Sequence, residues 1–261
     1  MKHRLTLLIP CKNEEKNIRP CIESATELAD EILVADSGST DRTMDIAREL
    51  GARIIEREYV NSADFKNWAI PQATHEWILL LDSDERATPR LVSEVRRILD
   101  GEPKYDGYWI YRANYLMGYR MRSCGWNSDK VIRLFKKEYR YEPKHVHAEV
   151  VMPRRKTGRL KGRLEHYTYW TFDQYLEKLD RYTKWGALDA KKKGTRPGLF
   201  ALMFRPAWRF FRHYFVQFGF LEGRRGFILA ALGAYSAFLK YARLWEMEKA
   251  KPQPDPEEGR T

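Results

Sequence analysis

Residues 77–85 read WILLLDSDE, an apolar run that ends in two carboxylates one residue apart, Asp82 and Asp84. Consecutive apolar residues of this kind predict a strand buried on both faces, as in a parallel sheet covered by helices. Such a strand would hold Asp82 and Asp84 at its carboxyl end, where open α/β sheets bind ligands. The two carboxylates favour a shared Mg²⁺ or Mn²⁺ ion, because hard cations prefer oxygen ligands. The alternative is an acidic turn before a helix that begins at Pro89.

The first 99 residues alternate between short apolar runs and amphipathic segments. We expect strands at 5–9, 31–35, 53–55 and 77–81 and helices at 18–28, 43–50, 63–72 and 89–99. This order predicts an α/β fold with a Rossmann-like, mostly parallel sheet and flanking helices.

The rest of the chain changes character twice. From 105 to 169 we expect short aromatic-rich strands, one at 130–135 and one near Val150, with a basic turn at 154–163. Beyond Phe172 the pattern is helical and aromatic, and it ends in a polar, Pro-rich tail. We therefore expect a catalytic domain at 1–165, a helical region at 166–250 and a flexible tail at 251–261.

Composition describes a globular chain with an anionic partner. Of the 261 residues 43% are hydrophobic and 32% are charged, and the formal net charge is +11. That charge suits nucleic acid, an acidic membrane surface or a phosphorylated substrate. The three cysteines lack a metal-type spacing, which favours reduced thiols in the cytoplasm. The N-terminal apolar run is too short for a signal peptide, and no stretch reaches the roughly 18 apolar residues expected of a spanning helix.

A second polar turn follows another expected strand. Residues 36–41 read DSGSTD, in which Gly38 permits a tight turn and Thr40 or Asp41 caps the next helix. Asp36, at the end of the strand, is placed to accept hydrogen bonds from a base or a ribose. A turn with a helix cap explains the segment on its own, and a nucleotide pocket competes because the Asp-x-Asp strand end is nearby.

Three segments in this order and spacing resemble the inverting family 2 glycosyltransferases of GT-A fold: LLIPCKNEEKNI at 7–18, ILVADSGSTDRT at 32–43 and WILLLDSDE at 77–85. The resemblance implies a nucleotide-sugar donor whose diphosphate is bridged by a divalent Mg²⁺ or Mn²⁺ ion. The donor-binding residues that it implies are Pro10, Lys12, Asn13, Glu14, Asp36, Lys66, Asp82 and Ser83. The metal ligands that it implies are Asp82, Asp84 and His147, the last with a hydrogen-bonded structural role as its alternative. A dication there would stabilise the charge that gathers on a departing diphosphate.

The same resemblance implies a carboxylate base, which an inverting transfer needs to take the proton of the acceptor hydroxyl. Asp129, in the segment GWNSDKVIRLF, occupies the place of the family's catalytic Asp, although Ser128 stands where the family usually has Glu. Glu149, in HVHAE, is the second candidate and resembles a Val-His-Glu element with one residue inserted. The residues expected to contact the acceptor are Trp126 and Arg133.

The C-terminal region carries an aromatic stripe beside arginines. Helical spacing aligns Phe204, Trp208, Phe211, Phe215 and Phe218 on one face. The flanking arginines are Arg205, Arg209 and Arg212. Between residues 196 and 243 there are eight Lys or Arg and a single acid, Glu222. This composition favours a helix lying in the interface of an anionic membrane, with Trp208, Phe211 and Phe215 inserted. The alternative is that the stripe packs on the catalytic domain or on a second subunit.

Within family 2, the stretch at about 164–248 resembles the bacterial lipopolysaccharide core glycosyltransferases, some of which are β-glucosyltransferases acting on inner-core heptose. This resemblance implies transfer from a UDP-sugar such as UDP-glucose to a lipid-linked saccharide at the cytoplasmic face of the inner membrane. A nucleotidyltransferase is an alternative, but it would ordinarily show a glycine-rich loop where the sequence has CKNEE. A non-catalytic sugar-nucleotide-binding membrane scaffold is a further alternative. Nucleic acid is not expected as a partner, because no nucleic-acid module is visible.

Overall fold

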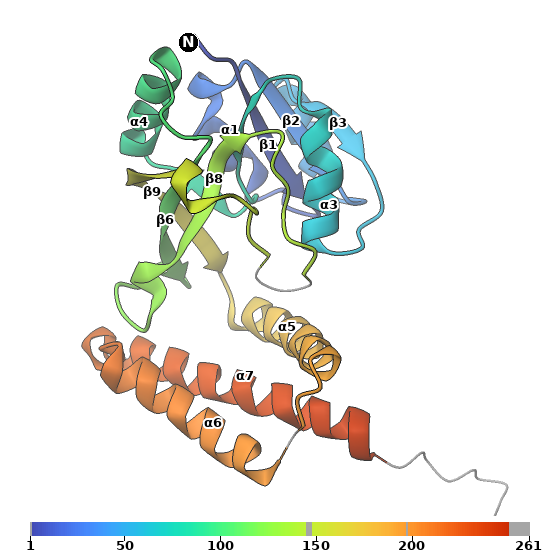
Figure 1. The fold of residues 1–261 in the computed structure, drawn as a ribbon, viewed down its shortest axis with the longest axis vertical. Coiled ribbons are helices and arrows are strands. Elements are labelled where there is room, and N and C mark those ends of the chain that lie inside the picture. The colour runs from blue at the N-terminus through green and yellow to red at the C-terminus, as the bar shows by residue number, and fades with distance from the viewer. Residues whose placement is uncertain (1, 145–147, 197, 251–261) are drawn as a thin grey trace, which may run out of the picture. The chain divides into compact units, whose positions relative to one another are not determined.

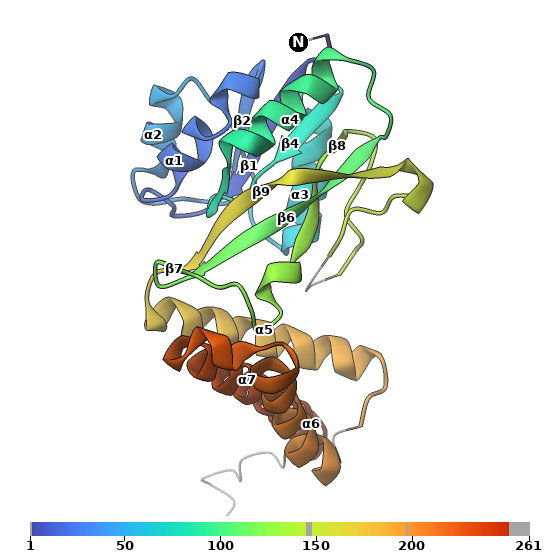
Figure 2. The same ribbon diagram turned by 90° about the vertical axis from the view of Figure 1, so that its left-hand side faces the viewer.

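The computed structural model describes residues 2–144, 148–196 and 198–250, which separate into two compact units between Phe172 and Asp173. Figures 1 and 2 show an α/β first unit and a helical second unit. The boundary expected after residue 165 falls within the last strand of the first unit, β9 (Thr157–Tyr169). That strand is paired along its length with the rest of the sheet, so the division comes after it.

The four strands expected in the first 99 residues form one half of the sheet. They are β1 (Leu5–Cys11), β2 (Glu31–Asp36), β3 (Arg53–Glu56) and β4 (Trp77–Leu80). All are parallel, in the order β3-β2-β1-β4. The α/β fold with a parallel Rossmann-like sheet is therefore confirmed for this half.

Helices cover both faces of this half-sheet. They are α1 (Ile18–Glu23), α2 (Thr43–Glu49), α3 (Ser62–Ala69) and α4 (Pro89–Asp100), with short 3₁₀ turns at Thr26–Leu28 and Ile70–Gln72. Within β4, Trp77 and Leu79 belong to the core beneath α1, α2 and α4, whereas Ile78 and Leu80 belong to the core beneath α3. The run WILLL is apolar throughout because both of its faces are buried.

The other half of the sheet is mixed. It contains β8 (Lys130–Lys136), β6 (Gly107–Leu116), β9 and β5 (Glu85–Ala87), with β7 (Tyr119–Arg120) paired to β6. β6 runs parallel to β9 and antiparallel to β8, and β8 joins this half antiparallel to β4. The whole sheet is consequently mixed rather than mostly parallel, which no local pattern in the sequence indicates.

Two expectations for this region were wrong. The stretch 154–163 is not a basic turn, because only Arg154–Lys156 forms a 3₁₀ turn and the rest belongs to β9. Leu160 and Leu164 are buried under α4 while the basic residues between them face outward, so the charges mark one face of a strand. Val150 makes only an isolated bridge with Tyr141.

The second unit consists of helices. They are α5 (Phe172–Lys192), α6 (Leu199–Phe211), a π turn at Arg212–Val216, a 3₁₀ turn at Gly219–Glu222 and α7 (Arg224–Lys249). Ala187 and Ala190 of α5 pack on Tyr241 and Leu244 of α7. By length and composition α7 would be able to cross a membrane, with a mean hydropathy of 1.2 over an 18-residue window of which 39% is buried in the fold. The expectation that no segment reaches spanning length was therefore wrong.

Candidate active site

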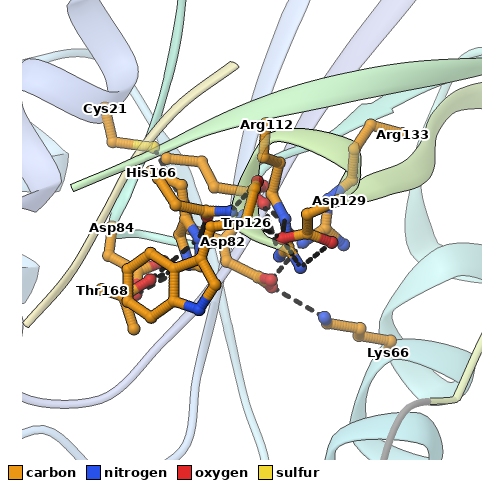
Figure 3. A network of polar contacts seen from close by, with 12 residues as sticks. Cys21, Lys66, Asp82, Asp84, Arg112, Trp126, Asp129, Arg133, His166 and Thr168 are labelled. Carbon is orange, nitrogen blue, oxygen red and sulfur yellow. Dashed lines mark hydrogen bonds and ion pairs between the residues drawn. The ribbon is translucent and has the colours of Figure 1, made fainter. Parts of the chain in front are cut away.

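The Asp-x-Asp motif lies directly after β4, where the chain turns toward β5. The turn is closed in both directions, because Glu85 N donates to the Asp82 carbonyl at 2.8 Å and Asp82 N donates to Glu85 Oε2 at 3.0 Å. The Asp82 carboxylate accepts from Arg133 and lies 2.7 Å from Lys66 Nζ of α3. Figure 3 shows this carboxylate between the two cations.

These contacts fix the protonation state of Asp82. Burial alone would raise the pKa of its carboxyl group, but the positive charges of Arg133 and Lys66 outweigh burial and hold that pKa well below its usual range. Asp82 is therefore an anion at neutral pH, and two side chains of the protein already balance its charge.

A buried acid continues the network. Glu85 is fully buried, and its Oε1 lies 2.8 Å from Arg133 Nη2 and 3.4 Å from Arg112 Nη1. Burial would lower the pKa of the Arg133 guanidinium, but Asp82 and Glu85 raise it well above its usual value. Charges of alternating sign thus run from Lys66 through Asp82, Arg133 and Glu85 to Arg112, so each buried charge has an opposite neighbour.

The chain of charges ends at Asp129, next to the start of β8. Arg112 holds this carboxylate with two bonds, Nε to Oδ2 at 2.8 Å and Nη2 to Oδ1 at 2.9 Å, and Asn114 Nδ2 donates to Oδ2 at 3.0 Å. Burial would raise the pKa of Asp129, but the charge and hydrogen bonds of Arg112 lower it overall. The Asp129 side chain remains 29% exposed, and a carboxylate has about four acceptor positions, so Oδ1 keeps capacity for a further donor.

His166 of β9 connects Asp129 to the second aspartate of the motif. His166 Nδ1 lies 2.6 Å from Oδ1 of Asn114, whose amide nitrogen binds Asp129. On its other side His166 Nε2 lies 3.5 Å from Asp84 Oδ2. Backbone pairing supports the same arrangement, because Tyr167 N donates to the Asp84 carbonyl at 2.9 Å. The carboxylates of Asp84 and Asp129 are therefore held by one network across β5, β6 and β9 (Figure 3).

Hydrogen bonds join the loop after β1 to the loop after β2, next to the Asp-x-Asp motif. Asn13, whose φ of 53° is left-handed, accepts from Thr40 N at 2.7 Å, and its own N–H donates to Ser39 Oγ at 2.9 Å. Glu14 N donates to Thr43 Oγ1 at 2.7 Å. The buried carboxylate of Asp36 accepts from Ser39 N at 2.9 Å and so closes its own turn. Together the two loops form the edge of the sheet at the carboxyl ends of β1 and β2.

The remaining predicted donor residues surround this edge. Pro10 is half-buried at the end of β1 and Lys12 is exposed in the loop that follows it. Ser83 is buried between the two aspartates, and Lys66 is buried against Asp82. The predicted donor residues therefore gather where β1, β2 and β4 end.

Not every predicted residue lies where we expected. Arg133 is not placed for acceptor contact, because its side chain is only 3% exposed and faces Asp82 and Glu85. Trp126 is half-buried, and its carbonyl accepts from Asn114 Nδ2 at 3.0 Å. The Glu149 side chain is exposed, and within the described ranges no hydrogen bond or ion pair joins its carboxylate to the network. His147 lies outside the described residues.

Sequence reasoning missed Glu85, Arg112, Asn114 and His166. Glu85 had a signal, because an acid directly after an Asp-x-Asp strand end has to find a cation when the turn is buried. Arg112 and Asn114 alternate along β6, but only the pairing of β6 with β8 and β9 brings them to Asp129. No local pattern could have found that contact.

The carboxylates suit a magnesium or manganese ion that also binds phosphate. In the described part of the chain no three His, Cys, Asp or Glu side chains converge on a complete metal cage. Mg²⁺ at nucleotide phosphates usually takes only one or two carboxylates and completes its shell with phosphate oxygens and water. The Asp84 carboxylate fits that partial set of ligands, whereas Asp82 would have to exchange a contact with Lys66 or Arg133 to join it.

The aromatic stripe of the second unit faces solvent. Trp208, Phe211 and Phe215 are each 46–49% exposed, and Phe204 is 50% exposed. Phe218 does not continue the helix, because it follows the π turn with a φ of 55°. Of the flanking arginines, Arg205 donates to Tyr241 of α7 and stacks on its ring at 4.9 Å. Arg209 and Arg212 are exposed.

Comparison with known proteins identifies relatives along almost the whole chain. The sequence profile of glycosyl transferase family 2 matches residues 6–156. The lipopolysaccharide core biosynthesis glycosyltransferase LpsC of Rhizobium meliloti is 29% identical over 96% of this chain and 95% of its own. An uncharacterized glycosyltransferase of Rickettsia typhi is 29% identical over 94% of this chain and 87% of its own. Among solved structures, the glucosyl-3-phosphoglycerate synthase of Mycobacterium tuberculosis, in complex with Mn²⁺, UDP and glucosyl-3-phosphoglycerate, is 24% identical over 43% of this chain and 44% of its own, with a TM-score of 0.35.

Proposed function

Because the chain belongs to glycosyl transferase family 2, we propose that it moves a sugar from a UDP-sugar, such as UDP-glucose, to a lipid-linked saccharide of the lipopolysaccharide core, with inversion of the anomeric centre. The observation that carries this proposal is the joint placement of Asp84 and Asp129, two carboxylates held by one network at the end of the parallel strands. The first lies at the motif expected to bind the diphosphate, and the second would receive the proton of the acceptor hydroxyl.

The donor would lie along the edge formed by the loops after β1 and β2. Asp36 would bind the ribose or the base, and it would exchange its bonds with Ser39 for bonds to the nucleotide. Asp82 would orient the donor while Lys66 and Arg133 balance its charge. A divalent metal ion held by Asp84, and in part by Asp82, would neutralise the departing diphosphate.

Asp129 would act as the base. An inverting transfer requires a carboxylate opposite the leaving group to accept the hydroxyl proton as that oxygen attacks. Arg112 keeps Asp129 ionised and fixes its plane through two parallel bonds. Asn114 fixes the carboxylate from the side, and His166 in turn orients Asn114.

The acceptor side of the proposal rests on the relation to LpsC and on the second unit. The exposed stripe of α6 presents bulky aromatic residues that would enter a membrane interface, with Arg209 and Arg212 near anionic head groups. This would place the enzyme at the cytoplasmic face of the inner membrane, where a lipid-linked acceptor is reached without leaving the bilayer.

The proposal is tested by release of UDP from a panel of UDP-sugars, with and without Mg²⁺ or Mn²⁺ and a detergent-solubilised core lipid acceptor. We expect turnover that needs both the acceptor and the ion. Asp84→Ala should abolish turnover and weaken donor binding only in the presence of the ion. Unchanged turnover in Asp84→Ala would refute the metal assignment, and a wild type that leaves every donor intact would favour the scaffold alternative.

A further inference from the structure

One face of the sheet beside Asp129 combines cations with aromatic rings. Neighbouring positions on three strands form one row, in which Lys130 of β8 pairs with Tyr111 of β6 and Tyr111 pairs with Arg163 of β9. The next row places Trp109 beside Arg159. Because registered neighbours share a face of the sheet, these five side chains point to the same side. Figure 2 shows β8, β6 and β9 side by side.

The cations lie on the rings. The Arg159 guanidinium lies 4.4 Å and that of Arg163 5.6 Å from the centre of the Tyr111 ring, and Lys130 Nζ lies 4.7 Å from the centre of the Trp109 ring. An arginine stacked on a ring keeps the N–H groups at its edge available for a carboxylate or a phosphate. Stacking also orders the side chain before a ligand arrives, which lowers the entropy lost on binding.

In the described part of the chain these three cations lack an acidic partner. Among the residues that the structure describes, no carboxylate lies within ion-pair distance of Lys130, Arg159 or Arg163, in contrast to Arg112 and Arg133 of the active-site network. Glu165, the next acid on this face of β9, is bonded by the hydroxyls of Tyr115 at 3.2 Å and Tyr167 at 3.0 Å. The patch therefore holds positive charge that no carboxylate of the described residues balances.

The patch is linked to the loop that carries the candidate base, but it lies on the other face of the sheet, because Tyr111 alternates along β6 with Arg112, which holds Asp129. Lys130 follows Asp129 in the chain, and Arg163 Nη1 donates to Asn127 Oδ1, two residues before Asp129, at 3.1 Å. A saccharide whose hydroxyl reaches Asp129 would therefore have to pass around the start of β8 to place an anionic group on Lys130 and Arg163. The predicted donor residues gather at the ends of β1, β2 and β4, which leaves the start of β8 to the acceptor.

We propose that Lys130, Arg159 and Arg163, ordered on Trp109 and Tyr111, form a subsite for a carboxylate or phosphate group on the acceptor saccharide. The inference rests on the proposed function, and it adds that the acceptor carries an anionic group on a sugar beyond the one that reacts. The arginines supply paired donors to the anion, and the lysine supplies a point charge.

The test compares Arg159→Gln/Arg163→Gln with a control, Arg90→Gln/Arg97→Gln, which removes the same charge from exposed positions of α4, on the other face of the sheet. The probes are lipid-free core oligosaccharides from bacterial lipopolysaccharide, either native or dephosphorylated and carboxyl-reduced. Titration calorimetry gives the Kd of each pair without any donor. Circular dichroism and Tm check that both variants are folded.

We expect the wild type and the control to bind the native oligosaccharide equally and the neutralised one more weakly. The Arg159/Arg163 variant should lose about tenfold or more on the native probe, as expected for charge-assisted hydrogen bonds, and nothing further on the neutralised one. Its KM for the native acceptor should rise by a similar factor, with the KM for the donor unchanged.

Three results would overturn the inference: equal affinity of the variant and the wild type for the native probe, equal affinity of the wild type for both probes, or no binding of either probe by the wild type. A fourth would be weaker binding of the variant to phosphatidylglycerol-containing vesicles while its affinity for the oligosaccharide stays unchanged, which would assign the patch to a lipid surface. Failure of the proposed function would give a different result, because the wild type would then leave UDP-sugars intact. The calorimetric comparison of the two oligosaccharides would still decide this inference.

Discussion

Asp129 and Glu149 differ in how their carboxylates are held, and a pair of variants separates them. Asp129→Asn keeps the shape and the bond to Arg112 Nε or Nη2 but removes the proton acceptor. We expect turnover to fall by about 10²–10⁴-fold, with the Kd for the donor unchanged. Glu149→Gln should leave turnover within about twofold of the wild type, because that side chain is exposed and apart from the network. Steady-state UDP release and donor titration provide the measurements, and the reverse pattern would make Glu149 the base.

The pH dependence of the reaction follows from Arg112. Arg112 lowers the pKa of Asp129, so the carboxylate stays ionised as the pH falls. If Asp129 is the base, as proposed, the enzyme should begin to lose activity only below the ordinary aspartate pKa of about 3.9. Arg112→Met removes that charge, so the pKa should rise and the acidic limb of kcat/KM should move to higher pH. The limb is measured from pH 3.5 to 8 over the range where circular dichroism shows folded protein. A limb that does not move would show that another group controls it.

Some of these residues were predictable and others were not, for a physical reason. Asp36, Asp82 and Asp84 were predictable because a buried strand that ends in an acid places that acid at the ligand-binding edge of the sheet. Arg133 was assigned to the acceptor, and the direction in which its side chain points cannot be read from the sequence. Its position is decided by β8 pairing with β4, which brings it to Asp82 across 51 residues of chain.

At the scale of elements, β9 is the strand that the sequence concealed. Three of its outward positions are basic, and two of its inward positions are glycine. The alternation of apolar and polar residues that marks a half-buried strand is therefore weak, and the stretch resembles a turn. The parallel strands were predictable because their apolar runs are continuous and turns or helices separate them. The mixed half depends on strand pairing between distant segments, such as β6 with β9, which local patterns do not specify.

Gly162 lies where β9 and α4 are in close contact, and replacing it should separate them. A Cβ at this position would lie 2.4 Å from Leu91 Cα and 2.5 Å from Leu91 N, and backbone atoms of a packed helix have little room to move. We expect Gly162→Ala to lower the free energy of unfolding by about 1–3 kcal/mol, as overpacking of a core does. Gly101→Ala at the end of α4 is the matched control, since its nearest atom would be at an ordinary 3.5 Å. Urea unfolding curves would contradict the prediction if both variants had the same midpoint.

At the scale of the whole molecule, the excess positive charge lies away from the reaction centre. In the active-site network Lys66, Arg112 and Arg133 are matched by Asp82, Glu85 and Asp129. The net charge of +11 therefore comes from surface groups such as the cations of the sheet patch and the arginines of the second unit. Anionic partners would accordingly meet the protein at its surface, while the network sets the charge of the active site.

Membrane association is the prediction that concerns the whole chain. Trp208 and Phe211 of α6 are 49% and 46% exposed, and burying each in a membrane interface should contribute roughly 1.5–3 kcal/mol. We expect Trp208→Ser/Phe211→Ser to weaken binding to anionic vesicles by about 100-fold or more and to move the protein from the membrane pellet to the supernatant. Val60→Ser/Val151→Ser, at exposed apolar positions of the first unit, should leave sedimentation unchanged. If the α6 variant still sediments with vesicles, the stripe has another partner, and α7, which is long and apolar enough to span a bilayer, becomes the segment to examine.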